Sequence, residues 1–321
     1  MAIISNCTAS IIKDAALALK QGHLVAFPTE TVYGLGADAT NEKAVARIYE
    51  VKGRPTDHPL IVHISSMELM DKWTSEIPEY AIQLARAFWP GPMTLVLPRT
   101  NLAKDYITGS QDTVAIRVPF HTLANQLLKE FESLGGHGVA APSANRFGKV
   151  SPTNSEAVED EIGKFLLEND KILDGGQSQI GIESTIIDCT GDSPLVLRPG
   201  AVSLEMIENL LDEKVCIQDP INISFRVPGS FKSHYAPNAR VVLNGVISPG
   251  EGFIAIEEIP TPAGAIRLAS PRNNLEYAHI LYGALRLADC TGIKTINVIP
   301  PEDQGIGLAV NNRLLKASKG D

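Results

Sequence analysis

Two cations separated by a glycine are the first feature of the sequence that could bind an anion. Lys52 and Arg54 flank Gly53, and Pro55 stiffens the chain after them. Lysine offers a point charge and arginine a planar fork of donors, so the two together suit the oxygens of a phosphate. Basic residues are also favoured at the solvated C-terminus of a helix, and this pattern alone leaves both interpretations open.

A further arginine lies in the middle of a predicted strand. Its apolar neighbours at positions 114, 116 and 118 share one face of the strand, so Arg117 is directed to the other face. A guanidinium that is buried there needs an anionic partner, because an unpaired buried charge is costly. That partner could be a carboxylate of the protein or a bound anion, and the sequence does not decide between them.

Small polar residues follow several apolar runs, where α/β proteins usually place their ligands. The clusters lie at 28–36, at 141–145 with Ser151 beyond it, and at 182–185 followed by Arg198. Each could be an ordinary turn. Together, hydroxyls and isolated cations suit a nucleotide phosphate and a small zwitterion better than an apolar ligand.

Other motifs argue against several familiar chemistries. The pattern Gly34-x-Gly36-x-x-Ala39 matches a dinucleotide fingerprint only weakly, because the glycines do not directly follow the preceding strand. The sequence has no G-x-x-x-x-G-K-[ST] loop, no G-x-S-x-G elbow and no H-E-x-x-H motif. His58 and His63 lack companions at the spacing of metal ligands.

The elements that must position these residues alternate between short apolar runs and amphipathic stretches. A helix is predicted over 10–21, ended by Gly22, and Asn41 caps a second helix that extends through Tyr49. The pattern indicates an α/β or α+β fold with a sheet of mixed direction. Strands are predicted at 24–27, 60–64, 94–97, 114–118, 139–141, 184–188 and 195–197.

The chain changes character after Gly200. Ser203 caps a short predicted helix, and residues 212–235 then show no regular period, which is typical of a linker or a functional loop. A second, smaller α/β domain follows, and we place the domains at 1–202 and 239–321, with a linker at 203–238. The predicted strands of the second domain are 241–243, 253–256, 265–268 and 295–299, and its predicted helices are 274–288 and 306–317.

Composition limits the partners that the protein could have. The 321 residues carry a net charge of −9, and residues 1–200 hold 17 basic against 24 acidic residues. A protein that grips a nucleic-acid backbone would need the opposite balance. The four cysteines lie far apart, and no apolar run or leader pattern predicts a membrane span or a secretory signal. We therefore expect a cytoplasmic protein with reduced thiols.

The same clusters resemble the YrdC-like threonylcarbamoyl-AMP synthases, in the order that this family has. The resemblance covers roughly residues 10–202, and the segment 233–237 with the domain after it resembles the longer, two-domain branch of the family. The matching blocks are Phe27-Pro28-Thr29-Glu30-Thr31-Val32-Tyr33-Gly34-Leu35-Gly36, Lys52-Gly53-Arg54-Pro55, Pro59-Leu60-Ile61-Val62-His63, Trp89-Pro90-Gly91-Pro92-Met93-Thr94, Ala115-Ile116-Arg117-Val118-Pro119, Ala141-Pro142-Ser143-Ala144-Asn145 and Glu183-Ser184-Thr185.

This resemblance implies a YrdC-like twisted mixed sheet followed by a Rossmann-like domain. It also implies a reaction in which the amine of L-threonine is carboxylated with bicarbonate and the carbamate then attacks the α-phosphate of ATP. Pyrophosphate leaves, and a separate transferase uses threonylcarbamoyl-AMP to modify transfer RNA. The resemblance implies Mg²⁺ carried on the ATP phosphates and no metal ligand from the protein.

The resemblance also implies a role for individual residues. Lys52 and Arg54 would be the catalytic cations, and Tyr235 would reach back from the linker to cover the nucleotide. The ATP site would comprise Lys52, Arg54, Thr56, Thr113, Ser143, Asn145, Ser151, Arg198 and Tyr235. The threonine site would comprise Thr29, Tyr33, His63, Arg117, the backbone of Ala141, and Ser184, with Arg117 pairing the carboxylate.

Three other functions compete with this one. A module of the same fold could bind double-stranded RNA, which the acidic first domain argues against. A related carbamoyltransferase would carry further metal-binding or acylphosphatase-like domains, and none is visible in the sequence. The second domain could have a purely structural or regulatory role, because its residues show no chemistry that we can name.

Overall fold

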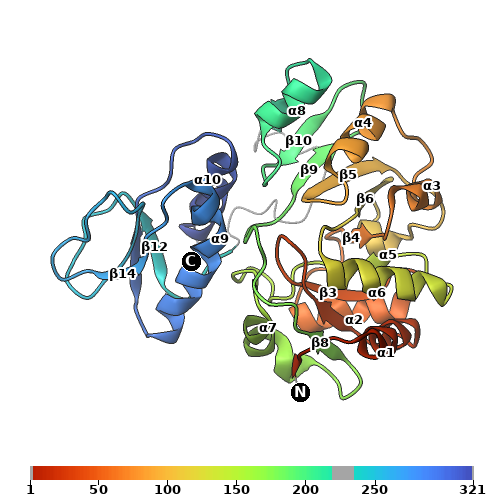
Figure 1. The fold of residues 1–321 in the computed structure, drawn as a ribbon, viewed down its shortest axis with the longest axis horizontal. Coiled ribbons are helices and arrows are strands. Elements are labelled where there is room, and N and C mark those ends of the chain that lie inside the picture. The colour runs from red at the N-terminus through yellow and green to blue at the C-terminus, as the bar shows by residue number, and fades with distance from the viewer. Residues whose placement is uncertain (1–2, 219–234, 320–321) are drawn as a thin grey trace.

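The computed structural model describes residues 3–218 and 235–319, which form two sheets with helices packed on them (Figure 1). The strands of the larger sheet are β1 (Ile3–Ile4), β2 (Val25–Phe27), β3 (Gly34–Asp38), β4 (Ile61–His63), β5 (Met93–Pro98), β6 (Thr113–Arg117), β7 (Val139–Ala140), β8 (Lys171–Leu173), β9 (Thr185–Asp188), β10 (Leu195–Arg198) and β11 (Cys216–Ile217). They lie in the order β1-β8-β2-β3-β7-β4-β6-β5-β9-β10-β11. Because β2 and β3 are antiparallel whereas β4 and β6 are parallel, the predicted mixed sheet is confirmed.

Side-chain capping defines several helices of this first part. Thr8 and Asn41 accept backbone hydrogen bonds at the start of α1 and α2, which satisfies amide groups that have no partner within the helix. The segment also contains the 3₁₀ turns Met67–Leu69 and Gly163–Phe165. The α-helices are α1 (Ala9–Lys20), α2 (Glu42–Lys52), α3 (Met70–Trp73), α4 (Glu79–Phe88), α5 (Asp105–Thr108), α6 (Thr122–Ser133), α7 (Ser155–Ile162) and α8 (Leu204–Leu211).

Alternating side chains of the buried strands divide the core into two layers. Leu24 and Ala26 pack in the cluster that includes the apolar faces of α2 and α4, whereas Val25 and Phe27 pack with α1 and α6 on the opposite face. A strand that is covered on both faces becomes a continuous apolar run, which explains the sequence Leu-Val-Ala-Phe before Pro28. Strand β2 is therefore held rigidly by the core, and the polar cluster at 28–36 follows it directly.

Strand β3 contradicts the weak dinucleotide fingerprint. Gly34 and Gly36 lie within an antiparallel strand paired to β2, not at the start of a helix. A Cβ on Gly36 would lie 2.7 Å from Val139 Cγ1 and 2.8 Å from Phe27 Cε1, so this glycine makes room for core side chains. The backbone of Gly36 is therefore approached closely by side chains of the core and not by a phosphate.

The second sheet contains the parallel strands β12 (Arg240–Leu243), β13 (Gly252–Ile254), β14 (Ile266–Ala269) and β15 (Thr295–Val298), in the order β12-β15-β13-β14. Helices α9 (Asn274–Cys290) and α10 (Ile306–Ala317) complete this Rossmann-like α/β unit, which confirms the prediction. In Figure 1 these two helices lie between the second sheet and the first domain. Side chains on α9 and α10 are therefore placed to reach the first domain.

The segment that joins the two sheets begins as part of the first. Strand β11 pairs in parallel with β10 at the edge of the larger sheet. Of the predicted linker, residues 219–234 lie outside the described residues, and the domain boundaries at 202 and 239 stay predictions. Within the described ranges, no helix has both the length and the apolar character that a membrane span requires.

Candidate functional site

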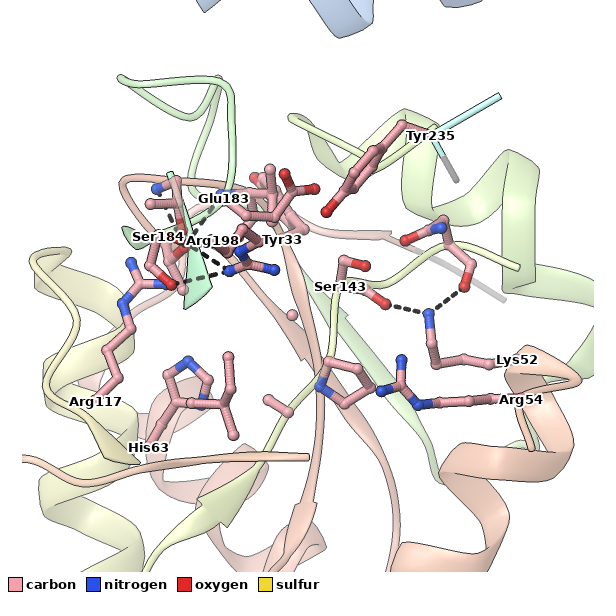
Figure 2. A pocket seen from close by; sticks show the side chains of 18 of the residues that line it. Tyr33, Lys52, Arg54, His63, Arg117, Ser143, Glu183, Ser184, Arg198 and Tyr235 are labelled. Atoms are coloured by element: carbon pink, nitrogen blue, oxygen red, sulfur yellow. Dashed lines mark hydrogen bonds between the residues drawn. The ribbon is translucent and has the colours of Figure 1, made fainter. Parts of the chain in front are cut away.

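One pocket collects most of the polar residues that the sequence analysis singled out (Figure 2). Its walls come from the loop before β3, the end of α2, strands β4 and β6, the loop after β7, and the segments around Ser184 and Arg198. The lining residues are Thr29, Thr31, Val32, Tyr33, Gly34, Lys52, Arg54, Ile61, His63, Arg117, Ala141, Pro142, Ser143, Asn145, Phe147, Glu183, Ser184, Arg198 and Tyr235.

Lys52 is buried at the C-terminal end of α2 and does not extend into solvent. Its ammonium group donates to the carbonyl oxygens of Ser143 and Asn145, each at 2.5 Å. Its side chain is 2% exposed, which rules out the solvated helix end that the sequence had left open. Burial, aided by the nearby Arg54, holds the pKa of Lys52 well below its usual value. An anionic ligand would relieve that cost.

Arg54 lies beside Lys52 and is also buried. One of its terminal nitrogens donates to the carbonyl of Pro59 at 2.8 Å, which fixes the plane of the guanidinium. Burial lowers the pKa of Arg54 to about 10, so the group stays protonated at neutral pH. Two buried cations at one wall of a pocket are strong recognition for a phosphate chain.

Arg117 forms an ion pair with a carboxylate of the protein. The Nη2 atom of Arg117 lies 2.7 Å from Oε1 of Glu30, and its Nε donates to the carbonyl of Gly91 at 3.3 Å. Both side chains of the ion pair are at most 5% exposed. Of the two partners that the sequence left open, the structure contains the carboxylate. His63 pairs with Arg117 in the register of β4 and β6, so the two side chains enter the pocket together.

Ser184 and Arg198 join two neighbouring strands at the pocket wall. Arg198 donates from Nε and Nη2 to the carbonyl of Ser184 at 3.1 and 3.0 Å, and from Nη2 to its hydroxyl at 3.2 Å. That hydroxyl also shares a 2.8 Å hydrogen bond with Thr94. Burial lowers the pKa of Arg198. The serine hydroxyl is therefore held in one orientation by a cation and a second hydroxyl.

The pocket has two distinct sides, which Figure 2 shows clearly. Arg117, His63 and Ser184 lie on one side, and Lys52 and Arg54 lie on the other. Tyr235 is buried above the second side, at the end that we call the mouth of the pocket, with its hydroxyl directed inward. A ligand that spans the pocket would place an anionic group at each side, which suits a triphosphate next to an amino acid.

Comparisons with known proteins agree with this geometry. A family model described as "Telomere recombination" matches residues 17–200, and one described as "Threonylcarbamoyl-AMP synthase, C-terminal domain" matches residues 202–319. The threonylcarbamoyl-AMP synthase of Pyrococcus abyssi is 43% identical and the alignment covers 99% of this chain and 98% of that protein. The chain belongs to the threonylcarbamoyl-AMP synthase family. Its resemblance to the longer, two-domain branch is confirmed.

A second relative and a solved structure extend the match for this synthase-family chain. The threonylcarbamoyl-AMP synthase of Bacillus subtilis is 40% identical, with 96% of this chain and 93% of that protein covered. The crystal structure of P. abyssi Sua5 complexed with L-threonine superposes with a TM-score of 0.88 at 40% identity, covering 99% of this chain and 98% of that one. The fold of both domains is therefore shared with a solved relative.

Twelve of the fifteen candidate residues of the synthase-family site line this pocket, and three do not. Thr56 is exposed outside it, and Thr113 lies at the start of β6, paired with Pro98. Ser151 is fully buried behind the wall, where its hydroxyl donates to Oε1 of Glu183 at 2.5 Å. Any effect of Ser151 on a ligand would therefore pass through Glu183.

Several candidate groups in the pocket already have partners within the protein. The Thr29 hydroxyl donates to the carbonyl of Val32 at 2.7 Å, and the Tyr33 hydroxyl donates to that of Gly176 at 2.7 Å. The Ala141 N–H donates to the carbonyl of Ile61, so this N–H is already used within the protein. Asn145 Oδ1 is buried without a hydrogen-bond donor among the described residues. A ligand N–H or O–H could satisfy it.

Two carboxylates are charged residues of the site that the sequence analysis did not select. Glu30 pairs Arg117, and Glu183 lies in the wall beside Ser184. Burial alone would raise the pKa of Glu183, but Arg313, Arg198 and the Ser151 hydroxyl outweigh it and lower this pKa to about 2. Buried arginines require carboxylates, but the sequence around these two glutamates did not mark them, because Glu30 stands between two threonines and Glu183 next to Ser184.

His63 should make the stability of the protein sensitive to mild acid. Burial, with the nearby Arg117, lowers the pKa of His63 to about 3, against 6.5 for an exposed histidine. A depressed pKa means that the folded state binds fewer protons than the unfolded state, so stability is complete above pH 6.5 and falls below it. Urea unfolding should show a loss of about 1.6 kcal/mol from His63 between pH 6.5 and pH 5, because the slope reaches its full ~1.4 kcal/mol per pH unit only well below pH 6.5.

The variant His63→Gln isolates this contribution, because glutamine does not titrate. We expect its unfolding free energy to fall less steeply over the same range of pH than that of the wild-type protein. Carboxylates with lowered pKa values, such as Glu183, lose their contribution to stability mainly below their unfolded pKa near 4.5. They therefore change the unfolding free energy little between pH 6.5 and pH 5. Equal slopes for the two proteins would contradict the assignment of a buried, neutral imidazole.

Proposed function

We propose that this chain synthesises threonylcarbamoyl-AMP from L-threonine, bicarbonate and ATP, with release of pyrophosphate. The observation that carries the proposal is the division of one pocket into a side with Arg117, His63 and Ser184 and a side with two buried cations. Membership of the synthase family and the threonine complex of the P. abyssi relative support the same assignment.

On this proposal, threonine binds on the Arg117 side. Arg117 receives its carboxylate, while Glu30 stays beside the guanidinium and limits the net charge there. His63 stays uncharged near neutral pH because its pKa is lowered to about 3, so it orients the substrate by hydrogen bonding. The threonine ammonium first loses a proton to bicarbonate or to a phosphate oxygen. The free amine then attacks the carbon of bicarbonate, and a second amine proton joins the departing hydroxyl, which leaves as water.

ATP binds on the opposite side as its magnesium complex, with the ion held by phosphate oxygens and water. The carbamate oxygen attacks the α-phosphorus, and pyrophosphate leaves in line. Such a transfer depends mainly on positioning and on neutralising charge, which Lys52, Arg54 and Arg198 supply. Tyr235 at the mouth would exclude water from the labile product. No covalent link to the protein is required.

We further propose that the protein works in the cytoplasm and passes its product to a separate transferase that modifies transfer RNA. Strong binding of nucleic acid by this chain is not expected, because its net charge is −9.

The assignment is tested by incubating purified protein with MgATP, L-threonine and ¹⁴C-bicarbonate and measuring pyrophosphate and labelled nucleotide. Both products should form together, and the omission of any one substrate should stop both. Pyrophosphate release that continues without threonine or bicarbonate would indicate ATP hydrolysis. Steeply salt-dependent binding of duplex RNA without product formation would favour the RNA-binding alternative.

A further inference from the structure

A buried carboxylate of the pocket wall is held by the second domain. Oε2 of Glu183 accepts hydrogen bonds from the Tyr282 hydroxyl on α9 and from Nε of Arg313 on α10, each at 2.9 Å. Ser151 of the first domain completes the set through Oε1. Tyr282 and Arg313 are both fully buried, so the contacts are shielded from water.

Arg313 also binds the neighbouring strand end of the first domain. Its Nη1 donates to the carbonyl of Pro199 at 2.8 Å, while its Nε holds Glu183. Arg198 precedes Pro199 in the chain, and Ser184 follows Glu183. Both residues line the pocket and bind each other. One side chain of the second domain therefore fixes the spacing of two pocket segments.

The same two residues contact the aromatic ring at the mouth of the pocket. The Tyr282 ring stacks on Tyr235 with centroids 5.9 Å apart and an interplanar angle of 23°. The guanidinium carbon of Arg313 lies 5.3 Å from the centroid of the Tyr235 ring, in a cation–π contact. The wall at Glu183 and the mouth at Tyr235 are thus oriented by one pair of side chains.

A buried ion pair between domains contributes little net stability compared with apolar packing of the same volume, but it defines geometry strictly. Removing one partner leaves a charge without compensation. The domains are joined by other contacts as well, including the ion pair of Arg286 with Glu161 at 3.0 Å, whose two side chains do not line this pocket. Arg313 and Tyr282 differ from Arg286 because they directly contact residues that line the pocket.

We propose that Arg313 and Tyr282 of the second domain are positioning residues for the nucleotide side of the pocket. This inference rests on the proposed function and gives the second domain a role in catalysis. By fixing Glu183, the Arg198–Ser184 contact and Tyr235 before the substrate arrives, the second domain reduces the reorganisation that ATP binding requires. On the threonine side, neither residue contacts Arg117 or His63, and Ser184 is reached only indirectly, through its chain neighbour Glu183 and through Arg198.

The test compares matched tyrosine variants on the same helix. Tyr282→Phe removes only the hydroxyl that binds Glu183 and keeps the ring that stacks on Tyr235. Tyr277→Phe is its control, because Tyr277 is equally buried on α9 but donates to the carbonyl of Ile299 at 3.1 Å, within the second domain. Tyr282→Phe should raise the KM for ATP about threefold to tenfold and the KM for threonine by less, because Arg117 and His63 are not contacted, and Tyr277→Phe should change neither.

A second pair of variants tests the arginine. Arg313→Lys keeps the charge but cannot bind Glu183 and Pro199 together, and we expect at least about a tenfold rise in the KM for ATP. Arg286→Met, which breaks the ion pair with Glu161, should retain the wild-type KM. If Arg313→Lys does not fold, the comparison of Tyr282→Phe with Tyr277→Phe still tests the inference.

Two outcomes overturn the inference while leaving the proposed function intact. The first is active wild-type protein with Tyr282→Phe and Arg313→Lys within twofold of it in the KM for ATP. The second is an equal effect of Tyr277→Phe, which would indicate general loosening of the domain. If wild-type protein forms no product, the proposed function fails, and titration of MgATP into the same variants then decides the inference. Absence of ATP binding by wild-type protein would overturn both.

Discussion

Replacing Lys52 with methionine is expected to lower kcat/KM for ATP by about two to three orders of magnitude, the scale on which preorganised charge acts in transfer reactions. Lys52 is held against Ser143 and Asn145 from the end of α2, so its charge is in place before the nucleotide arrives. Methionine has a similar length and no charge. Pyrophosphate release at saturating threonine and bicarbonate is the measurement.

The control must separate the lost charge from a disturbed fold. Methionine leaves the carbonyls of Ser143 and Asn145 without their donor, which we expect to cost about 1–3 kcal/mol of stability. Affinity for threonine should nevertheless stay within about threefold of wild type, because that side of the pocket does not contact Lys52. Lys129→Met on the exposed face of α6 makes the same change in net charge and should leave kcat/KM for ATP unchanged. Wild-type kinetics for Lys52→Met would contradict the phosphate site.

Much of the fold follows from local sequence signals. The helix predicted at 306–317 coincides with α10, and the predicted strands at 24–27 and 114–118 agree with β2 and β6 to within a residue. These segments combine a regular apolar pattern with, in the case of β2, a clear stop at Pro28. Helices α4, α6 and α7 are absent from the prediction although Asn154 caps α7 regularly, so their signals were available.

Strand β3 could not be predicted from its own residues. Its glycines are poor strand formers, and they are placed in the sheet because Phe27 and Val139 pack against their bare backbone. The contact of Val139 with Gly36 joins residues that are more than a hundred positions apart. Tertiary packing here overrides local preference, and the fingerprint pattern was misleading for that reason.

The site was predictable in its cations but not in its carboxylates. Lys52, Arg54, Arg117 and Arg198 stand out because a charge inside or beside an apolar run is rare. Their partners come from distant segments, and only the assembled sheet shows that Glu30 reaches Arg117. The contacts of Arg313 with Glu183 required the relative placement of two domains, which no spacing in the sequence encodes.

Arg117 is the residue whose replacement should separate threonine binding from ATP binding. Removing its charge entirely would leave Glu30 buried without a partner, and Arg117→Met should therefore lose about 3–5 kcal/mol of stability as well as its substrate. Arg117→Lys avoids this problem, because the ammonium can still pair with Glu30. A lysine cannot form the planar fork that serves Glu30 and a bound carboxylate together, so affinity for threonine should fall at least about tenfold. The affinity for MgATP, titrated separately, should stay near that of wild-type protein, since the phosphate side does not contact Arg117. Loss of both affinities in a variant that unfolds at the wild-type temperature would mean that the two sides of the pocket are not independent, and an unchanged affinity for threonine would remove Arg117 from the site.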